Sequence, residues 1–140
     1  MSTQVEETLV LVKPDGVARN LTGEILRRIE AKGYSLVDMK LIQAERTLLA
    51  EHYAEHEGKP FYEPLIEFME SGPIVAFRVA GNRVIEGFRA LAGTTDPTTA
   101  APGTIRGDLG RDWGAKVQQN LVHGSDSPES AATELALWFD

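Results

Sequence analysis

The run Thr8-Leu9-Val10-Leu11-Val12-Lys13-Pro14-Asp15-Gly16 sets the architecture of this chain. Its first five residues form an unbroken apolar, β-prone segment, which is typical of a central strand. The proline, aspartate and glycine that follow favour a turn. The sequence therefore predicts a strand in the middle of a sheet, with Lys13 at its end.

The segments on either side of this run alternate between strand and helix patterns. We expect strands over residues 34–42, 74–79 and 120–123, and helices over residues 22–32, 47–56, 60–70, 83–91 and 128–137. This order is typical of an α+β sandwich: a ferredoxin-like split βαβ domain whose four-stranded antiparallel sheet is covered by helices. Without a linker or repeat, residues 1–140 are predicted to form a single domain. Residues 93–112 show no sustained period, and a loop of that length is usually functional.

The charge and composition narrow the class of partner. With 14 Lys and Arg against 21 Asp and Glu, the net charge is −7. This acidity argues against nucleic-acid binding, which depends on clustered cations, so any anionic substrate must be attracted locally. The lack of cysteine excludes disulfides and thiolate chemistry and is compatible with a reducing compartment. Because no signal-peptide pattern or long apolar run is present, we expect a cytoplasmic protein without membrane contact.

The candidate reactive residue is His123, which ends the last apolar run just before a glycine and a Ser-Pro helix start. One nitrogen of a neutral imidazole can act as a nucleophile or base while a hydrogen bond holds the other. In a strand, Ser125 would project to the same side as His123. Glu134 falls on the apolar stripe of the next helix, where a partly buried carboxylate needs a partner, and the His123 ring would provide one. The alternatives are a structural histidine and a solvated glutamate.

Three cations, Lys13, Arg89 and Arg106, stand beside turns, and Thr95 and Thr104 add hydroxyl groups nearby. The planar fork of arginine suits phosphate oxygens. Since the chain lacks a Walker loop, phosphoryl chemistry would depend on such side chains. Each cation could instead be solvated. A Ser-His-Asp hydrolase is not supported, because the His-Gly-Ser-Asp residues adjoin in sequence and Gly-x-Ser-x-Gly is absent.

Two further features each allow two interpretations. His52 and His56 lie four positions apart in a predicted helix, which suits either two metal ligands or an ordinary helix surface. We favour the helix surface, since only two ligands are evident. Phe61, at a helix start, is expected either in the core or as a platform for a nucleobase, and the residues alone leave that choice open.

Three motifs occur together in one order. They are Leu11-Val12-Lys13-Pro14-Asp15-Gly16, Thr104-Ile105-Arg106-Gly107-Asp108 and Asn120-x-x-His123-Gly124-Ser125-Asp126. On these residues the chain resembles the nucleoside diphosphate kinase family, from about Thr8 to Phe139. Each motif alone is moderately specific, and their joint occurrence is highly specific.

The resemblance implies a ferredoxin-like fold and transfer of the terminal phosphoryl group from ATP or another nucleoside triphosphate to a nucleoside diphosphate, by a ping-pong route through a phosphohistidine. His123 matches the phosphorylated residue, Glu134 matches the carboxylate that orients it, and Ser125 and Tyr53 match supporting side chains. The residues that match nucleotide-binding groups are Lys13, Arg89, Thr95 and Arg106 for the phosphates, Lys13 and Asn120 for the ribose, and Phe61 for the base. Magnesium (Mg2+) is expected between the phosphates of the nucleotide.

One stretch departs from the family pattern. Residues 109–119 are a few residues longer than the usual spacing, in a region that borders the base in relatives. By resemblance, Val117 would cover the base opposite Phe61, and Trp113 would pack on a neighbouring subunit. The family forms homotetramers and homohexamers, and we favour a hexamer. A nucleotide-binding regulatory module ranks behind the enzyme, because the histidine and its cationic partners are all present. A nucleic-acid-binding sheet ranks last, because the basic surface and exposed strand aromatics that it needs are not evident.

Overall fold

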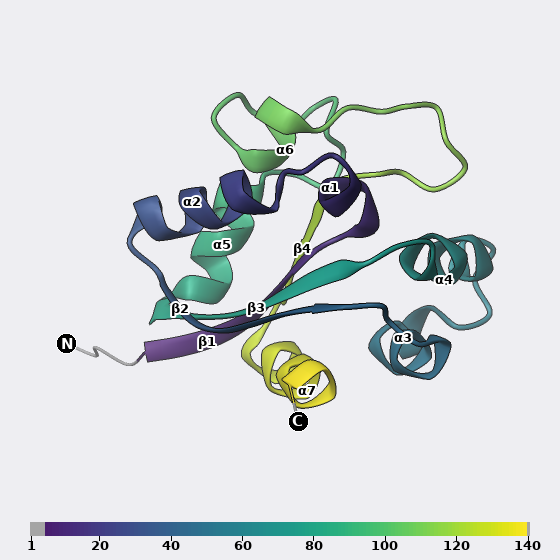
Figure 1. The fold of residues 1–140 in the computed structure, drawn as a ribbon, viewed down its shortest axis with the longest axis horizontal. Helices are drawn as coiled ribbons and strands as arrows, with labels where there is room; N and C mark the ends of the chain where they lie inside the picture. Colours follow the sequence, from purple (N-terminus) through teal and green to yellow (C-terminus); the bar gives the residue numbers. More distant parts are fainter. Residues whose placement is uncertain (1–4, 140) are drawn as a thin grey trace.

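The computed structural model describes residues 5–139. The strands are β1 (Val5–Val12), β2 (Ser35–Ile42), β3 (Ile74–Asn82) and β4 (Val122–Gly124). The helices are α1 (Pro14–Ala18), α2 (Thr22–Lys32), α3 (Arg46–His52), α4 (Tyr62–Glu70), α5 (Val84–Ala92), α6 (Ile105–Leu109) and α7 (Pro128–Phe139), with a 3-10 turn at Ala54–His56. Figure 1 shows the sheet between two layers of helices. Among the described residues, no helix combines the length and apolarity that crossing a membrane requires.

The strands form one sheet in the order β2-β3-β1-β4, and each neighbouring pair is antiparallel. This is the ferredoxin-like α+β arrangement that the sequence predicts. β1 is central, as expected, and its residues Leu9 to Val12 are fully buried. Leu11 of β1 pairs with His123 of β4, so the end of the central strand brings Lys13 close to the last strand.

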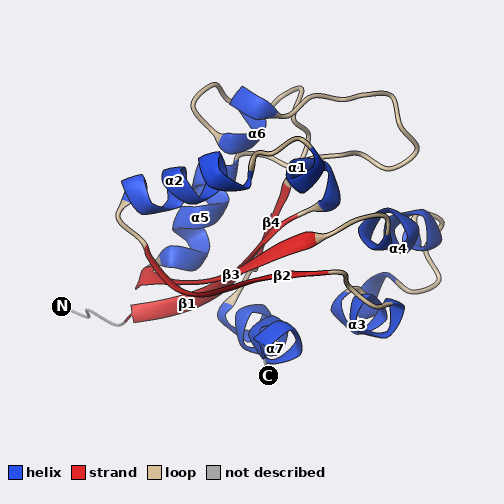
Figure 2. Cartoon of the chain, viewed as in Figure 1, coloured by secondary structure: helices blue, strands red, loops and turns tan. Residues whose placement is uncertain are grey.

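Alternate residues of β1 enter two separate cores, one on each face of the sheet. Val10 and Val12 pack with apolar residues of α2 and α5, whereas Leu9 and Leu11 pack with those of α3, α4 and α7. In Figure 2, α2 and α5 lie on one side of the sheet and α3 and α7 on the other. Burial of one such side chain is worth about 1.5–3 kcal/mol. The second core therefore holds α7 firmly against the sheet, with Glu134 on its inner side.

The chain after Val12 differs from the predicted turn. Residues Pro14–Ala18 form the short helix α1, in which Pro14 occupies the first turn. Proline is favoured there, because it lacks the N–H that a first helical residue would leave unpaired. The predicted helix over residues 47–56 also differs, since α3 ends at His52 and a 3-10 turn follows.

Two other boundaries were not evident from periodicity. The helix predicted from Pro60 begins at Tyr62. The unpatterned residues 93–112 contain α6, whose first turn is capped by Thr104 Oγ1 accepting from Gly107 N. A helix this short shows no period, and its cap is the main local signal.

Candidate active site

His123 lies where β4 meets β1. Its Nε2 donates to Glu134 Oε1 at 2.8 Å, and Ser125 Oγ donates to the same oxygen at 2.7 Å. Because an ionised carboxylate only accepts hydrogen bonds, Nε2 carries a proton, and in the neutral ring Nδ1 is the nitrogen with the free lone pair. Leu9 N donates to Ser125 Oγ at 3.3 Å, which fastens this group to the central strand.

The Glu134 carboxylate is held in its ionised form. Burial by itself would raise its pKa, but the hydrogen bonds from His123 and Ser125 outweigh burial, and the pKa lies below its ordinary value. The side chains of His123 and Glu134 are 20% and 15% exposed. The imidazole therefore has a fixed negative partner on one side and access to solvent on the other.

The backbone before His123 is strained at Leu121, which has a φ of 73° without being glycine. Such a conformation costs about 1–3 kcal/mol and persists only where the surroundings enforce it. Here Leu121 N donates to Asp15 Oδ2 at 3.1 Å, and Lys13 N donates to Leu121 O at 2.8 Å. The start of α1 thus fixes the strained residue that aims Asn120 and His123. The motif contains Asp15, but sequence reasoning gave it no role.

Hydrogen bonds join three of the residues matched to nucleotide binding. Lys13 Nζ donates to Asn120 Oδ1 at 3.0 Å, and Asn120 Nδ2 donates to the carbonyl of Thr95 at 3.1 Å. Burial, aided by the positive charge of Arg106, lowers the pKa of Lys13 to about 8. A phosphate bound here would offset both effects and keep the ammonium charged.

Arg106 of α6 is anchored by three backbone carbonyls. Its Nε, Nη1 and Nη2 donate to Asn120 O (3.0 Å), Gly93 O (2.9 Å) and Val122 O (2.7 Å). A guanidinium has five N–H donors, so two remain for a ligand. Burial, with repulsion from Arg89, lowers the Arg106 pKa to about 10, and the group stays charged at neutral pH.

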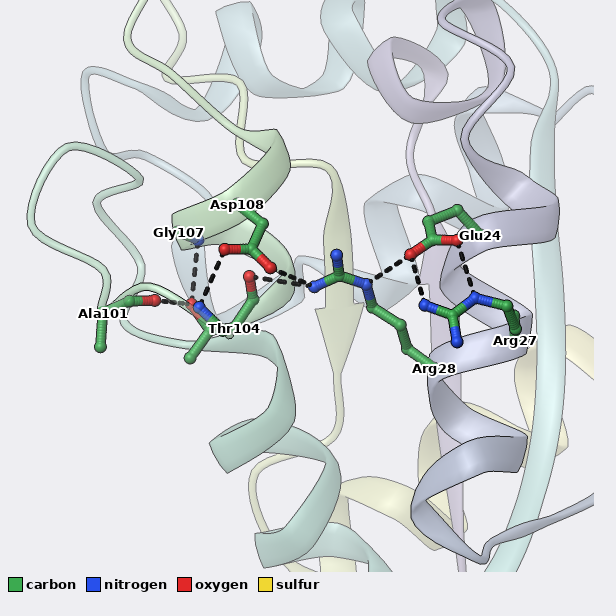
Figure 3. A network of polar contacts seen from close by, with 8 residues as sticks. Glu24, Arg27, Arg28, Ala101, Thr104, Gly107 and Asp108 are labelled. Carbon is green, nitrogen blue, oxygen red and sulfur yellow. Dashed lines mark hydrogen bonds and ion pairs between the residues drawn. The ribbon is translucent and has the colours of Figure 1, made fainter.

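Figure 3 shows how α6 is fastened to α2. Arg28 Nη1 donates to Asp108 Oδ2 at 2.8 Å, while Asp108 Oδ1 accepts from Gly103 N at 2.8 Å. Glu24 Oε2 in turn accepts from Arg28 Nε at 2.8 Å. Arg27 shares Glu24, but both of its hydrogen bonds go to that carboxylate and neither reaches α6. Arg28 is therefore the residue of this pair that supports the helix carrying Arg106.

The cleft beside His123 has a volume of about 320 Å³. Of the ten residues predicted from sequence, eight line it: Lys13, Tyr53, Arg89, Thr95, Arg106, Asn120, His123 and Glu134. Ser125 is fully buried behind Glu134. Phe61 lies outside the lining and is 48% exposed, with its ring centroid 5.3 Å from that of His56, which does line the cleft.

His52 and His56 belong to different local structures, since α3 ends between them. His52 accepts from Trp138 Nε1, whereas Lys59 Nζ lies 3.2 Å from His56 Nδ1. Instead, His52 groups with His123 and Glu134, whose possible ligand atoms lie within 4.8 Å of one another. Sequence reasoning missed this placement, because the contact with Trp138 spans 86 positions.

Tyr53 is buried, and its Oη has no hydrogen-bond partner among the described residues. Burial raises the pKa of this phenol, so it stays protonated and can donate to a ligand. In the long stretch after α6, Trp113 is 50% exposed and lies against Arg111, whose guanidinium carbon is 4.1 Å from the ring centroid. Neither Trp113 nor Val117 lines the cleft, and their expected contacts with a neighbouring subunit and a base remain predictions.

A ferredoxin-like sheet that presents a histidine to a cleft lined by cations defines an α+β protein suited to handling an anionic group. The family model of nucleoside diphosphate kinase matches residues 6–140, and the chain belongs to that family. It is 60% identical to the nucleoside diphosphate kinase of Saccharopolyspora erythraea over 135 residues, 96% of each chain. The nucleoside diphosphate kinase of Mycobacterium avium (strain 104) is also 60% identical, again over 96% of each chain. A solved halophilic nucleoside diphosphate kinase from Halobacterium salinarum, in complex with CDP, is 46% identical with a TM-score of 0.92, covering 98% of this chain and 89% of that one.

Proposed function

We propose that this protein is a nucleoside diphosphate kinase that moves the terminal phosphoryl group of a nucleoside triphosphate to a nucleoside diphosphate through a phosphohistidine on His123. One observation carries the proposal. The hydrogen bond from Nε2 to Glu134 leaves Nδ1 of the same ring as a nucleophile, in a cleft lined by Lys13, Arg89 and Arg106. The family match over residues 6–140 supports this activity and a single-domain chain. The cysteine-free composition is in keeping with a cytoplasmic protein.

The exchange proceeds in two half-reactions. In the first, the Nδ1 lone pair of His123 bonds to the terminal phosphorus, the bond from that phosphorus to its bridging oxygen breaks, and the diphosphate leaves with the electron pair. Glu134 stabilises the positive charge that develops on the ring, through the Nε2 proton. In the second, a terminal oxygen of the incoming diphosphate attacks the phosphorus and the N–P bond breaks. Because both steps share one pocket, ping-pong kinetics follow.

The positive side chains supply most of the stabilisation. Phosphoryl transfer needs in-line positioning and offsetting of charge on the moving group, which Lys13, Arg89 and Arg106 would provide. We assign Thr95 to the phosphates, and Asn120 together with Lys13 to the ribose hydroxyls. The hydrogen bonds that join these last three residues support the assignment, because they hold the groups in one arrangement before a nucleotide binds.

The remaining predicted residues have supporting roles. Ser125 acts through its hydrogen bond to Glu134. Tyr53 lines the cleft, and its buried hydroxyl has no hydrogen-bond partner among the described residues, so we assign it a supporting role beside the reactive centre. Phe61 offers an exposed ring on which a base can stack. Stacking engages only the π-face of a base, so the enzyme should accept several nucleobases.

The cations of the cleft suit a nucleotide that arrives with Mg2+ already on its phosphates. Lys13, Arg89 and Arg106 would repel a bare divalent cation. The possible metal ligands grouped among the described residues include two imidazoles and one carboxylate, whereas Mg2+ prefers oxygen. We therefore assign the ion to the nucleotide, where it would neutralise phosphate charge.

The direct test uses ATP labelled at its terminal phosphorus. The protein should take up label in an acid-labile form on His123 and should release it to added GDP. Label that stays on the protein when GDP is added would exclude a transfer intermediate. A protein that takes up no label, yet binds ATP, would instead be a nucleotide-binding module.

Glu134→Ala should slow phosphorylation of His123 about 10- to 100-fold, because a ring that is free to turn rarely presents Nδ1 in line. Nucleotide affinity should change little, since Glu134 holds the imidazole and not the phosphates. Rapid-quench labelling gives the rate and calorimetry gives the affinity. Glu129→Ala, an exposed carboxylate in the first turn of the same helix, is the control. Normal turnover with lost affinity would refute the role.

Nucleotide affinity should weaken as the pH rises through about 8, because the Lys13 ammonium loses its proton there in the free protein. Below that pH the lysine is already charged, so binding takes up no proton. Above it, the bound phosphates raise the pKa and binding takes up a proton. Calorimetry in buffers of different ionisation enthalpy measures this uptake. Lys13→Arg should abolish it, and a pH-independent affinity for the wild type would contradict the prediction.

Arg28→Met should weaken ADP binding about five-fold, because α6 loses a partly buried ion pair worth about 1 kcal/mol and Arg106 is held less firmly. Arg27→Met removes a neighbouring arginine that shares Glu24 and should leave binding unchanged. Dissociation constants from calorimetry separate the two. Equal effects of both substitutions would show that the link to α6 is not responsible.

We also propose that the protein forms a homo-oligomer, a hexamer in preference to a tetramer, with β2 at a contact between copies. β2 is an edge strand, and Val37, Met39 and Leu41 on it are 52%, 47% and 66% exposed. An apolar edge strand without cover readily pairs with another chain. Native mass spectrometry should show a discrete oligomer, which Leu41→Lys shifts to smaller species. A wild-type monomer would contradict the proposal.

A further inference from the structure

His52 is held between two partners that lie far away in the sequence. It is the last residue of α3, and Trp138 Nε1 of α7 donates to its Nδ1 at 3.1 Å. On its other side, the His52 ring lies edge to face with the ring of His123, with centroids 4.7 Å apart and planes at 73°. His52 also lines the cleft. The contact with the reactive histidine is therefore direct.

The hydrogen bond from Trp138 determines the tautomer of His52. An indole N–H can only donate, so Nδ1 of His52 must be the unprotonated nitrogen and Nε2 must carry the proton. Protonation of Nδ1 would break this bond. Burial lowers the pKa of His52 to about 3, aided by the charges of His123, Lys13 and His56 and opposed by Glu134. The ring is consequently neutral wherever the enzyme works.

Glu134 alone cannot fix the orientation of the His123 ring. Its hydrogen bond holds one atom, Nε2, and still permits the ring to turn about the line from Nε2 to the carboxylate oxygen. The Nδ1 lone pair lies in the plane of the ring, so such a turn would swing it away from the phosphorus. The edge-to-face contact with His52 supplies the second restraint, which sets the plane.

The neutral state of His52 also protects the interaction between His123 and Glu134. As His123 takes up phosphorus, its ring becomes positive and depends on Glu134. A charged His52 would repel that ring and compete for the carboxylate, because ligand atoms of all three side chains lie within 4.8 Å.

Resting on the proposed function, we infer that His52 is a positioning residue for phosphoryl transfer: its ring, held by Trp138 in one uncharged tautomer, sets the plane in which His123 attacks. It contacts the reactive ring and Trp138, and neither of these is a group assigned to the phosphates. Its loss should consequently affect the rate of phosphorylation and leave nucleotide affinity unchanged.

Two substitutions separate this role from a structural one. His52→Gln keeps an acceptor for Trp138 but removes the ring, so it should preserve thermal stability and slow phosphorylation about 10- to 100-fold. His52→Phe keeps a ring edge but leaves the indole N–H unpaired, so it should lower stability and retain more of the rate. Glu51→Ala, at an exposed site one residue earlier in α3, is the control. A wild-type rate for His52→Gln, measured by single-turnover labelling with ADP affinity checked in parallel, would overturn the inference.

Nitrogen NMR of the wild-type protein gives an independent readout that does not depend on how the variants fold. His52 should show a protonated Nε2 and an unprotonated Nδ1 throughout the neutral range, and Trp138→Phe, which removes the indole donor, should let the proton move between the two nitrogens. A proton on Nδ1, or titration in the wild type, would refute the inference.

The failure of this inference can be told apart from failure of the proposed function. If the wild type forms no phosphohistidine, the proposed function itself fails. A normal phosphohistidine together with an unaffected His52→Gln variant rejects only the role of His52.

Discussion

His123→Ala should lower phosphoryl exchange by about 10⁴-fold or more, because the proposed mechanism needs the His123 ring to hold the phosphoryl group between the two half-reactions. Nδ1 of His123 is the nucleophile that the Glu134 hydrogen bond leaves free. The cations of the cleft do not depend on this ring, since Lys13 bonds to Asn120 and Arg106 bonds to backbone carbonyls. ADP should therefore still bind. A coupled exchange assay measures the rate and calorimetry the affinity.

His123→Gln provides a matched comparison. Its amide can still donate to Glu134, so the carboxylate keeps a partner, but it has no nucleophilic ring nitrogen. Both variants should be equally inactive if the missing nucleophile is the cause. Substantial exchange by His123→Gln would mean that phosphorus passes directly between nucleotides, which contradicts the phosphohistidine mechanism.

The sequence predicts best those parts of the fold whose burial follows from a local pattern of apolar residues. The apolar run that begins at Thr8 predicts a central strand, because both faces of a sheet are covered only near its middle. The stripe that contains Ala131, Leu135 and Trp138 likewise predicts which side of α7 faces the sheet, and all three residues are buried. The pairing of His123 with Glu134 follows from the same pattern, since a carboxylate on that stripe needs a nearby partner.

The parts that sequence could not predict depend on contacts between distant segments. The carbonyls that anchor Arg106 belong to Gly93, Asn120 and Val122, and a carbonyl has no signature in the sequence. The placement of the His52 ring is similar, because Trp138, which is distant in the sequence, holds it by a hydrogen bond. Short elements such as α6 also lack the length over which a period becomes visible.

Arg106→Lys should reduce phosphorylation of His123 about 10³-fold, the lower end of what a phosphate-stabilising arginine contributes to phosphoryl transfer. The reason is geometric. The guanidinium bonds to three carbonyls and still has donors to offer a phosphate, whereas an ammonium is a single point with three N–H groups. Lysine can satisfy the carbonyls or reach the ligand, but it cannot do both.

The same substitution should destabilise the fold, because each buried carbonyl left without a donor costs about 1–3 kcal/mol. Denaturant unfolding measures that loss, and single-turnover labelling measures the rate. Arg89→Lys is the control, since Arg89 is exposed and lines the same cleft. It should weaken the reaction without a comparable loss of stability. If the two lysine variants were equally stable, the carbonyls would not depend on the Arg106 guanidinium, and its role would reduce to charge alone.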